Sequence, residues 1–273
     1  MAPTSDQARL DGLMAGPQHP RIRELLAVRK DSAPGRIMVE GSWEHSQLLD
    51  SRTVIHAFFY CPEAADRTAE RAARVASRAR EVYRISEKLL ARLSRRTRPD
   101  GLISLAELPV WHPGEFRFDE SSLVLVADGV EYAGNLGTLI RTVDAARADC
   151  LVLTSRRARL NHPSVYAASR GMVLTTPVLE FDDVADAAGW LRRHGFEVHL
   201  ADPGAAGSYR VPAYQGRPTA FVVGSEGGGL SSRWHQEGFG AVSIPMLGQA
   251  DSLNVALSAG ILLFEARAHK DGW

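Results

Sequence analysis

The 273-residue chain is poor in cysteine and shows no metal-binding pattern among its histidines. Cys61 and Cys150 are too far apart in sequence to form a CxxC metal or redox motif. A single pair is also a thin basis for a disulfide scaffold, so we expect both cysteines to be buried free thiols. The nine histidines lack zinc-type spacing. No metal is expected, and His162, His194 and His199 are expected at the surface or at helix caps.

The chain also lacks long apolar runs and net charge. No segment approaches the roughly 20 uninterrupted apolar residues that span a bilayer. Residues 1–16 do not have the basic-then-apolar pattern of an export signal, so we expect a cytoplasmic protein. The formal net charge is zero, yet residues up to about 110 carry a modest basic excess that the rest balances. A basic, nucleic-acid-binding face can therefore exist inside a neutral total.

The length and the changes of pattern along the chain favour two domains. Residues 52–60 (RTVIHAFFY) predict a buried strand, and residues 66–96 predict helical segments with arginines on the outside. Residues 109–118 (PVWHPGEFRF) contain two prolines and a glycine without a sustained period, which indicates a linker. We therefore predict one domain over residues 1–113 and a second over residues 114–273.

The second domain alternates short apolar runs with helical pattern. The runs are SLVLVADG, CLVLT, TPVLEF, EVHLAD, AFVVGSEG and VSIPM. Nearly continuous apolar strands are typical of a parallel sheet covered by helices on both faces, so the fold class is α/β. Ligands of such sheets bind outside the carboxyl ends of the strands.

The last helical segment, residues 252–270, is apolar almost all round. Small residues lie on one side of it, which would let another backbone approach closely: Ser252, Ala256, Ala259 and Gly260. Such a helix is buried either in the core or in a contact between subunits, and we expect a homodimer.

Three strand ends carry unusual polar or glycine-rich sequence. The first, residues 128–141, places Asn135 and Arg141 six positions apart, so a helix beginning near Asn135 can bring both toward one polar pocket. The second, residues 221–231, is a glycine-dense loop that is neither a Walker loop nor a nucleophile elbow, and its glycines permit close approach to a flat ligand. The third, residues 244–255, joins Pro245 to a Ser-Leu-Asn helix opening. Taken singly, each also suits an ordinary helix cap or turn.

Together and in this order, the three segments resemble the signature motifs of the SpoU (TrmH-like) branch of the SPOUT RNA methyltransferases. The similarity rests on the Asn135/Arg141 spacing, on the run Gly224 to Gly229, and on the run Ile244 to Val255. It extends more weakly to residues 20–41 and 85–105, which are similar to the family's L30e-like substrate-binding domain. The resemblance implies an α/β SPOUT domain with a parallel sheet and a trefoil knot, bound S-adenosylmethionine, a homodimer, and methylation of a ribose 2'-hydroxyl of RNA.

The resemblance also implies which residues form the site. The catalytic group comprises Asn135, Arg141, Glu226, Ser252 and Asn254. The S-adenosylmethionine site comprises Leu200, Gly224, Ser225, Glu226, Gly228, Ile244, Met246, Ser252, Leu253 and Asn254. In the first domain, the densest basic cluster suits RNA phosphates and comprises Arg92, Arg95, Arg96 and Arg98.

Other functions are consistent with parts of the sequence. A catalytically dead RNA-binding or ribosome-assembly protein would keep the fold. The joint presence of five residues argues against it: Asn135, Arg141, Glu226, Ser252 and Asn254. A nucleotide-binding dehydrogenase lacks support because no G-x-G-x-x-G follows the first strand of the second domain. Within the family, the domain plan resembles thiostrepton-resistance 23S ribosomal RNA methyltransferases. Transfer RNA stays open as a substrate, and so does the choice between antibiotic resistance and housekeeping.

Overall fold

A computed structural model describes residues 9–10, 12–30, 33, 35–65 and 67–273. The contacts divide the chain into two compact units, Met1–Pro109 with Asn161–Pro163, and Val110–Leu160 with Ser164–Trp273. The change from one unit to the other at Pro109 falls in the proline-containing segment 109–118, slightly before the boundary we placed after residue 113.

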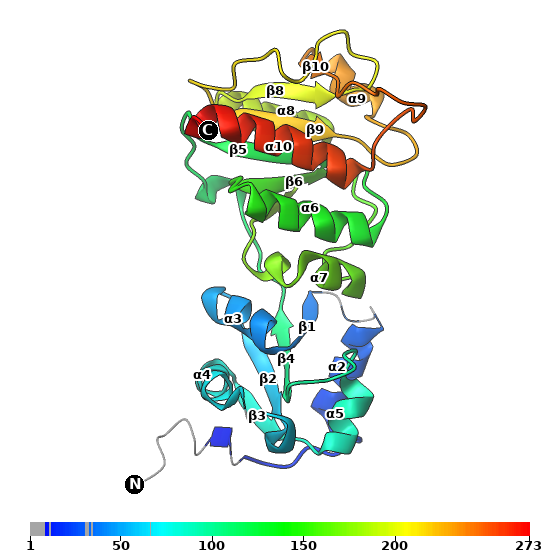
Figure 1. Cartoon of the computed structure of the whole chain (residues 1–273). Helices are drawn as coiled ribbons and strands as arrows, with labels where there is room; N and C mark the ends of the chain where they lie inside the picture. The colour runs from blue at the N-terminus through cyan, green and yellow to red at the C-terminus, as the bar shows by residue number, and fades with distance from the viewer. Residues whose placement is uncertain (1–8, 11, 31–32, 34, 66) are drawn as a thin grey trace. The chain divides into compact units, whose positions relative to one another are not determined.

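The first unit is built on a four-stranded mixed sheet in the order β1-β4-β2-β3. The strands are β1 (Arg36–Glu40), β2 (Ile55–Tyr60), β3 (Glu81–Arg84) and β4 (Leu102–Glu107). β4 pairs antiparallel with β1 and β2, whereas β2 and β3 are parallel. Helices α2 (Pro20–Arg29) and α5 (Glu87–Leu93) cover one face, and α3 (Ser42–Asp50) and α4 (Ala69–Arg78) cover the other (Figure 1). Short 3-10 turns lie at Pro62–Ala64 and, in the second unit, at Pro113–Glu115.

The local sequence explains most of these elements. The predicted strand over 52–60 is confirmed in β2, whose six residues are all buried. Helix α5 begins after Ser86, whose side chain accepts a hydrogen bond from the Leu89 amide. The helical prediction over 66–96 is wrong at β3, which separates α4 from α5. Val82 and Tyr83 are good strand formers, and the open edge of β2 supplies backbone partners that the local pattern does not show.

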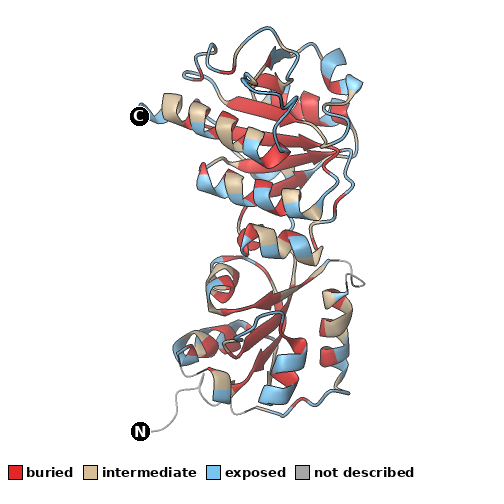
Figure 2. Cartoon of the chain, turned by 45° about the vertical axis from the view of Figure 1, so that its right-hand side comes forward, coloured by how far each residue is buried: buried red, intermediate tan, exposed pale blue. Residues whose placement is uncertain are grey.

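The second unit contains the predicted parallel sheet. Its six strands follow the order β10-β8-β9-β5-β6-β7, and every neighbouring pair is parallel. They are β5 (Leu123–Asp128), β6 (Cys150–Thr154), β7 (Val178–Glu180), β8 (Glu197–Ala201), β9 (Thr219–Val223) and β10 (Gly240–Val242). The central strands are buried on both faces, which accounts for their continuous apolar sequence (Figure 2).

Helices cover both faces of this sheet (Figure 1). Helices α6 (Ala133–Ala145) and α10 (Val255–Asp271) pack together on one face, and α10 also contacts β5 and β9. Helices α8 (Val184–Arg193) and α9 (Ser232–Gln236) cover the other face, where Trp190 and Trp234 enter the core. Helix α7 (Pro163–Ser169) and the turn Met172–Leu174 lie between β6 and β7 along the chain. The α/β architecture with a parallel sheet is therefore confirmed.

The last strand ends earlier than its apolar sequence predicts. β10 stops at Val242, so Ser243 to Met246 already belong to the loop. The Ser243 amide donates to the Gly207 carbonyl at 2.8 Å instead of joining the sheet ladder. Pro245 has no amide hydrogen to donate. The apolar side chains of Ile244 and Met246 are thereby released from the sheet and line a pocket.

The small-residue side of the last helix packs within the same unit. Ala256 and Ala259 are buried, and Gly260 lies where an added Cβ would be 3.8 Å from Thr142 of α6. Ser252 precedes the helix, and Asn254 is its N-cap, accepting from the Ala256 amide at 2.9 Å. The small residues therefore allow α10 to pack closely against α6.

Three further expectations can be compared with the structure. Cys61 and Cys150 are buried and free, as predicted. His194 is the C-cap residue of α8, as expected, but His199 is not at the surface. It is buried in β8 against Tyr214 and Phe221, and this burial lowers the pKa of its imidazole. Within the described ranges, no helix is long and apolar enough to cross a bilayer.

Candidate active site

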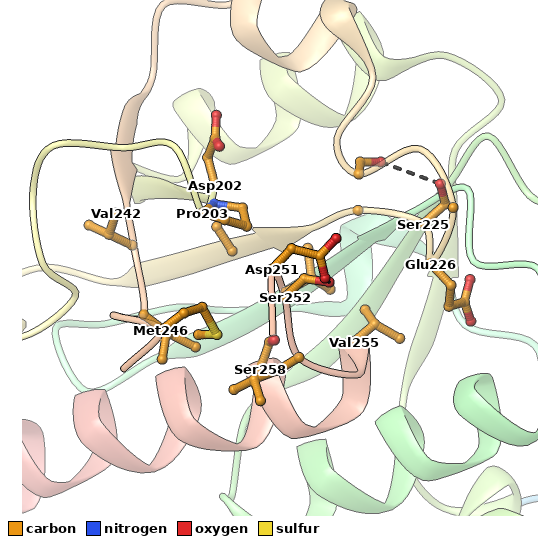
Figure 3. Close-up of a pocket in the computed structure, with 17 residues that line it drawn as sticks. Asp202, Pro203, Ser225, Glu226, Val242, Met246, Asp251, Ser252, Val255 and Ser258 are labelled. Atoms are coloured by element: carbon orange, nitrogen blue, oxygen red, sulfur yellow. Dashed lines mark hydrogen bonds between the residues drawn. The ribbon is translucent and has the colours of Figure 1, made fainter. Parts of the chain in front are cut away.

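A pocket of about 270 Å³ lies at the carboxyl ends of β8 and β9 and beside the start of α10. Figure 3 shows that its walls come from three loops that follow β8, β9 and β10. The residues that line it and that the sequence predicted for the cofactor are Gly224, Ser225, Glu226, Ile244, Met246, Ser252 and Leu253. Leu200, Gly228 and Asn254 are not part of the lining: Leu200 is buried in β8, and the other two lie in the same loops.

The glycine-rich loop after β9 closes on itself. The Ser225 and Gly229 backbones exchange hydrogen bonds of 2.9 and 3.0 Å. A Cβ placed on Gly224 would lie 2.1 Å from the carbonyl carbon of Gly229 and 2.2 Å from the Leu230 amide nitrogen. Gly229 has a φ of +64°, which side chains disfavour. The sequence interpretation assigned the glycines to ligand approach, but Gly224 is needed because the loop packs against its own backbone.

Polar side chains from all three motifs form one hydrogen-bonded chain. Asn135, near the start of α6, donates from Nδ2 to Glu226 Oε1 at 2.5 Å. Asn254, the N-cap of α10, donates from Nδ2 to Asn135 Oδ1 at 3.2 Å. The Glu131 amide donates to Glu226 Oε2 at 3.3 Å. Asn135 therefore links the pocket loop to the beginning of α10.

The electrostatic environment of Glu226 favours its ionised form. Partial burial alone would raise its pKa, but the hydrogen bonds from Asn135 and from the amides of Glu131 and Tyr132 outweigh this effect. The pKa of Glu226 therefore lies below its ordinary value. A carboxylate with a lowered pKa is a weak base near neutral pH, so the geometry suits Glu226 to orienting and charge stabilisation.

Arg141 does not reach this pocket within one chain. It is exposed on α6 and is absent from the pocket lining. Residues six positions apart on a helix differ by roughly 120° around the axis, so Asn135 and Arg141 point in different directions. The structure thus brings Asn135, Glu226 and Asn254 together and leaves Arg141 apart.

A buried carboxylate that sequence reasoning missed supports the pocket loop. Asp128, at the end of β5, accepts hydrogen bonds from Thr154 Oγ1 at 2.9 Å and Ser155 Oγ at 2.7 Å. It also accepts from the Ser231 amide at 3.0 Å, where the glycine-rich loop ends. Burial acts to raise the pKa of Asp128, but these hydrogen bonds lower it overall. Its position at the end of a strand, as the first residue of the segment 128–141, was the available signal.

Two acidic pocket residues were also missed. Asp202 follows β8, and Asp251 lies just before the Ser-Leu-Asn opening of α10. Both fall at the carboxyl edge of the sheet, where the sequence already placed the ligand. Figure 3 shows Asp202 and Asp251 on different walls and Glu226 on the side toward α6.

The predicted arginine cluster of the first unit divides into two kinds. Arg96 pairs with Glu44 at 2.5 Å and donates to the Glu40 carbonyl at 2.9 Å, and Arg95 donates to the Arg29 carbonyl at 2.6 Å. All four arginines are exposed, but within the described part of the chain the side chains of Arg92 and Arg98 form no hydrogen bond or ion pair. Half of the cluster therefore stabilises the fold through these contacts.

A parallel α/β sheet with a partly apolar, acidic pocket at its carboxyl edge defines a small-molecule-binding catalytic domain. The chain belongs to the SpoU rRNA methylase family, whose model matches residues 122–264. Residues 20–104 match the MRM3-like substrate binding domain. The resemblance inferred from the motifs is thus confirmed. Among the described residues, no group of three or more histidine, cysteine, aspartate or glutamate side chains could hold a metal ion.

Relatives and solved structures agree with this membership. A Staphylococcus haemolyticus protein assigned to the TrmH family of tRNA/rRNA methyltransferases is 34% identical over 53% of this chain. The matched region spans 57% of the length of that relative. An uncharacterized tRNA/rRNA methyltransferase of Synechocystis is 26% identical over 97% of this chain and 95% of its own length. The AdoMet-bound rRNA methyltransferase of Sinorhizobium meliloti superposes with a TM-score of 0.84 at 27% identity, covering 94% of this chain and 98% of that one. The structure of an RNA 2'-O ribose methyltransferase superposes with a TM-score of 0.75 at 32% identity, covering 93% of this chain and 98% of that one.

Proposed function

We propose that this protein transfers a methyl group from S-adenosylmethionine to a ribose 2'-hydroxyl of RNA. The observation that carries the proposal is the charge of the pocket. Its lining contains the carboxylates of Asp202, Glu226 and Asp251, and no lysine, arginine or histidine among the described residues that form it. Such a pocket favours a cationic ligand and disfavours a dinucleotide with its pyrophosphate, which argues against the dehydrogenase alternative.

The residues of the pocket fit S-adenosylmethionine. Val242, Ile244, Met246 and Leu253 offer an apolar surface for the adenine, and backbone groups around Gly224 are available to its ring nitrogens. The acidic side chains suit the positively charged sulfonium and amino groups. When bound, the cofactor supplies an electrophilic methyl group on that sulfonium.

The protein must align the hydroxyl and stabilise the charge that develops on its oxygen. Asn135 is held by Glu226 and Asn254, so its amide is fixed before a substrate binds. Arg141 carries a guanidinium, a group that is a poor general base but a good hydrogen-bond donor to phosphate. We assign it to an RNA phosphate and to the developing alkoxide.

Because Arg141 lies outside its own pocket, we further propose a homodimer in which one protomer's Arg141 serves the pocket of the other. An exposed apolar stripe supports this proposal. Leu257 and Phe264 of α10 are 60% and 42% exposed, and a spacing of seven residues puts them on one side of the helix. The helix is thus apolar on an outer side as well as toward the sheet.

We propose that the substrate is ribosomal RNA. The similar Sinorhizobium meliloti protein is described as an rRNA methyltransferase. The match of residues 20–104 to a substrate binding domain supports a division of labour in which the first unit binds RNA. The 23S target, the resistance role and the trefoil knot stay predictions of the family resemblance.

The test is methylation of total RNA with labelled S-adenosylmethionine, followed by mapping of the modified nucleotide. The proposal expects a 2'-O-methyl ribose in ribosomal RNA. Label in transfer RNA would favour the alternative substrate. Cofactor binding without methyl transfer to any RNA would favour the catalytically dead RNA-binding protein, and calorimetry with NAD as the competing ligand would test the dehydrogenase.

A further inference from the structure

The first unit exposes a tryptophan that the proposed reaction does not use. Trp43 is the second residue of α3, and 54% of its surface is exposed. Single exposed apolar residues are common and need no special explanation, so the surroundings of Trp43 must carry the argument. These surroundings combine a fixed backbone with unpaired positive charge.

The backbone on both sides of Trp43 is held by the neighbouring loop and helix. The Ser42 amide donates to Asp100 Oδ2 at 2.6 Å, and Arg71 of α4 donates to the Ser42 carbonyl at 2.9 Å. On the other side, Glu44 pairs with Arg96. The indole is therefore presented from an ordered turn, which reduces the entropy lost when a ligand stacks on it.

Three exposed arginines belong to the segments that hold this turn in place. Arg74 lies three residues after Arg71 on α4, about one helical turn away. Arg67 lies in the turn before α4, next to Thr68, whose hydroxyl donates to the Asp100 carbonyl at 3.1 Å. Arg98 lies in the loop that contains Asp100. All three are exposed. None of them forms an ion pair with another residue of the described chain. We call Trp43, Arg67, Arg74 and Arg98 the Trp43 surface.

We propose that Trp43 is a stacking platform for an unpaired base of the RNA substrate, with Arg67, Arg74 and Arg98 contacting the flanking phosphates. An exposed aromatic ring among arginines is the chemistry that binds single-stranded nucleic acid. A second copy of this chain fits poorly, because a two-fold contact would bring the same positive charges together. The inference rests on the proposed function and adds that the first unit selects RNA with an accessible nucleotide.

The experiment measures binding of two labelled RNAs to the full chain by fluorescence anisotropy, without cofactor. The first is an unstructured single strand of about 12 nucleotides, and the second is the same strand annealed to its complement. We expect Trp43→Ala to weaken single-strand binding roughly tenfold, because a stacked base is lost. Duplex binding should change less than about twofold, and the salt dependence should stay the same because no phosphate contact is removed.

Two matched variants identify the interaction. Trp43→Phe keeps an aromatic face and should retain most of the single-strand affinity. Trp273→Ala removes a tryptophan that is 70% exposed in the second unit, and it should leave binding unchanged. Replacing Arg67, Arg74 and Arg98 by glutamine should weaken the binding of both RNAs. It should also reduce the slope of log affinity against log salt concentration for the single strand by about 2.

The proposal is overturned if Trp43→Ala weakens single strand and duplex equally, if it weakens neither, or if the unaltered chain does not bind the single strand. Methyl transfer is assayed separately. An unaltered chain that binds single strands through Trp43 but methylates no RNA refutes the proposed function and leaves the stacking site. A chain that methylates RNA while Trp43→Ala binds normally refutes only the stacking site.

Discussion

Gly224→Ala should disrupt the pocket through backbone crowding. The added Cβ would lie 2.1 to 2.3 Å from three backbone atoms of Gly229 and Leu230. Ordinary contacts of a Cβ begin near 3.4 Å, so the loop must move by about 1 Å, and backbone atoms cannot rotate aside as a side chain can. Crowding of this kind costs about 1–3 kcal/mol. If about 2 kcal/mol of it is expressed in cofactor binding, the Kd for S-adenosylmethionine rises roughly 30-fold.

Calorimetry with S-adenosylmethionine and thermal unfolding measure the two parts of this effect. Gly227→Ala is the matched control: it lies in the same loop and in the pocket lining, and nothing is within 4 Å of its added Cβ. It should leave the unfolding temperature unchanged. If Gly224→Ala binds the cofactor within twofold of the unaltered protein and unfolds at the same temperature, the self-packing explanation of this loop is wrong.

Three further predictions concern catalysis, acid stability and assembly. Arg141→Ala should abolish methyl transfer while cofactor affinity stays within a few fold, because Arg141 is assigned to the RNA and not to the cofactor; calorimetry showing that binding is lost as well would contradict the assignment. The pKa of Asp128 is lowered by folding, so its stabilisation is present above the ordinary value of 3.8 and is lost as the pH falls through the lowered pKa. Asp128→Asn should destabilise the protein by about 1–3 kcal/mol at neutral pH, because asparagine has one acceptor oxygen and no charge where Asp128 accepts from three donors through two oxygens. The urea denaturation midpoint of this variant should depend less on pH between neutral and acid conditions; an unchanged acid dependence would refute this. Sedimentation should show a dimer at micromolar concentration that Leu257→Asp with Phe264→Asp dissociates, whereas a monomer in the unaltered protein would reject the dimer.

Periodicity and short motifs predicted the parts of the fold that depend on local sequence. Strands β5, β6 and β9 were predictable because residues buried on both faces must be apolar in succession. The ligand edge followed, because parallel strands place their carboxyl ends on the same side. β3 was missed since a short strand with partly exposed residues gains its partners from β2, outside its own sequence.

The amino-acid sequence by itself determined the α/β class, the family motifs and the edge of the sheet where they meet. Only the tertiary structure decided which side chains pair, because hydrogen bonds between Asn135 and residues 91 and 119 positions away require distant segments to be positioned within about 3 Å. It also separated Arg141 from the pocket, since the direction of a side chain on α6 depends on how that helix packs. For the same reason, it assigned Arg96 to Glu44: a buried carboxylate needs a partner, and the sequence does not show which residues become buried together.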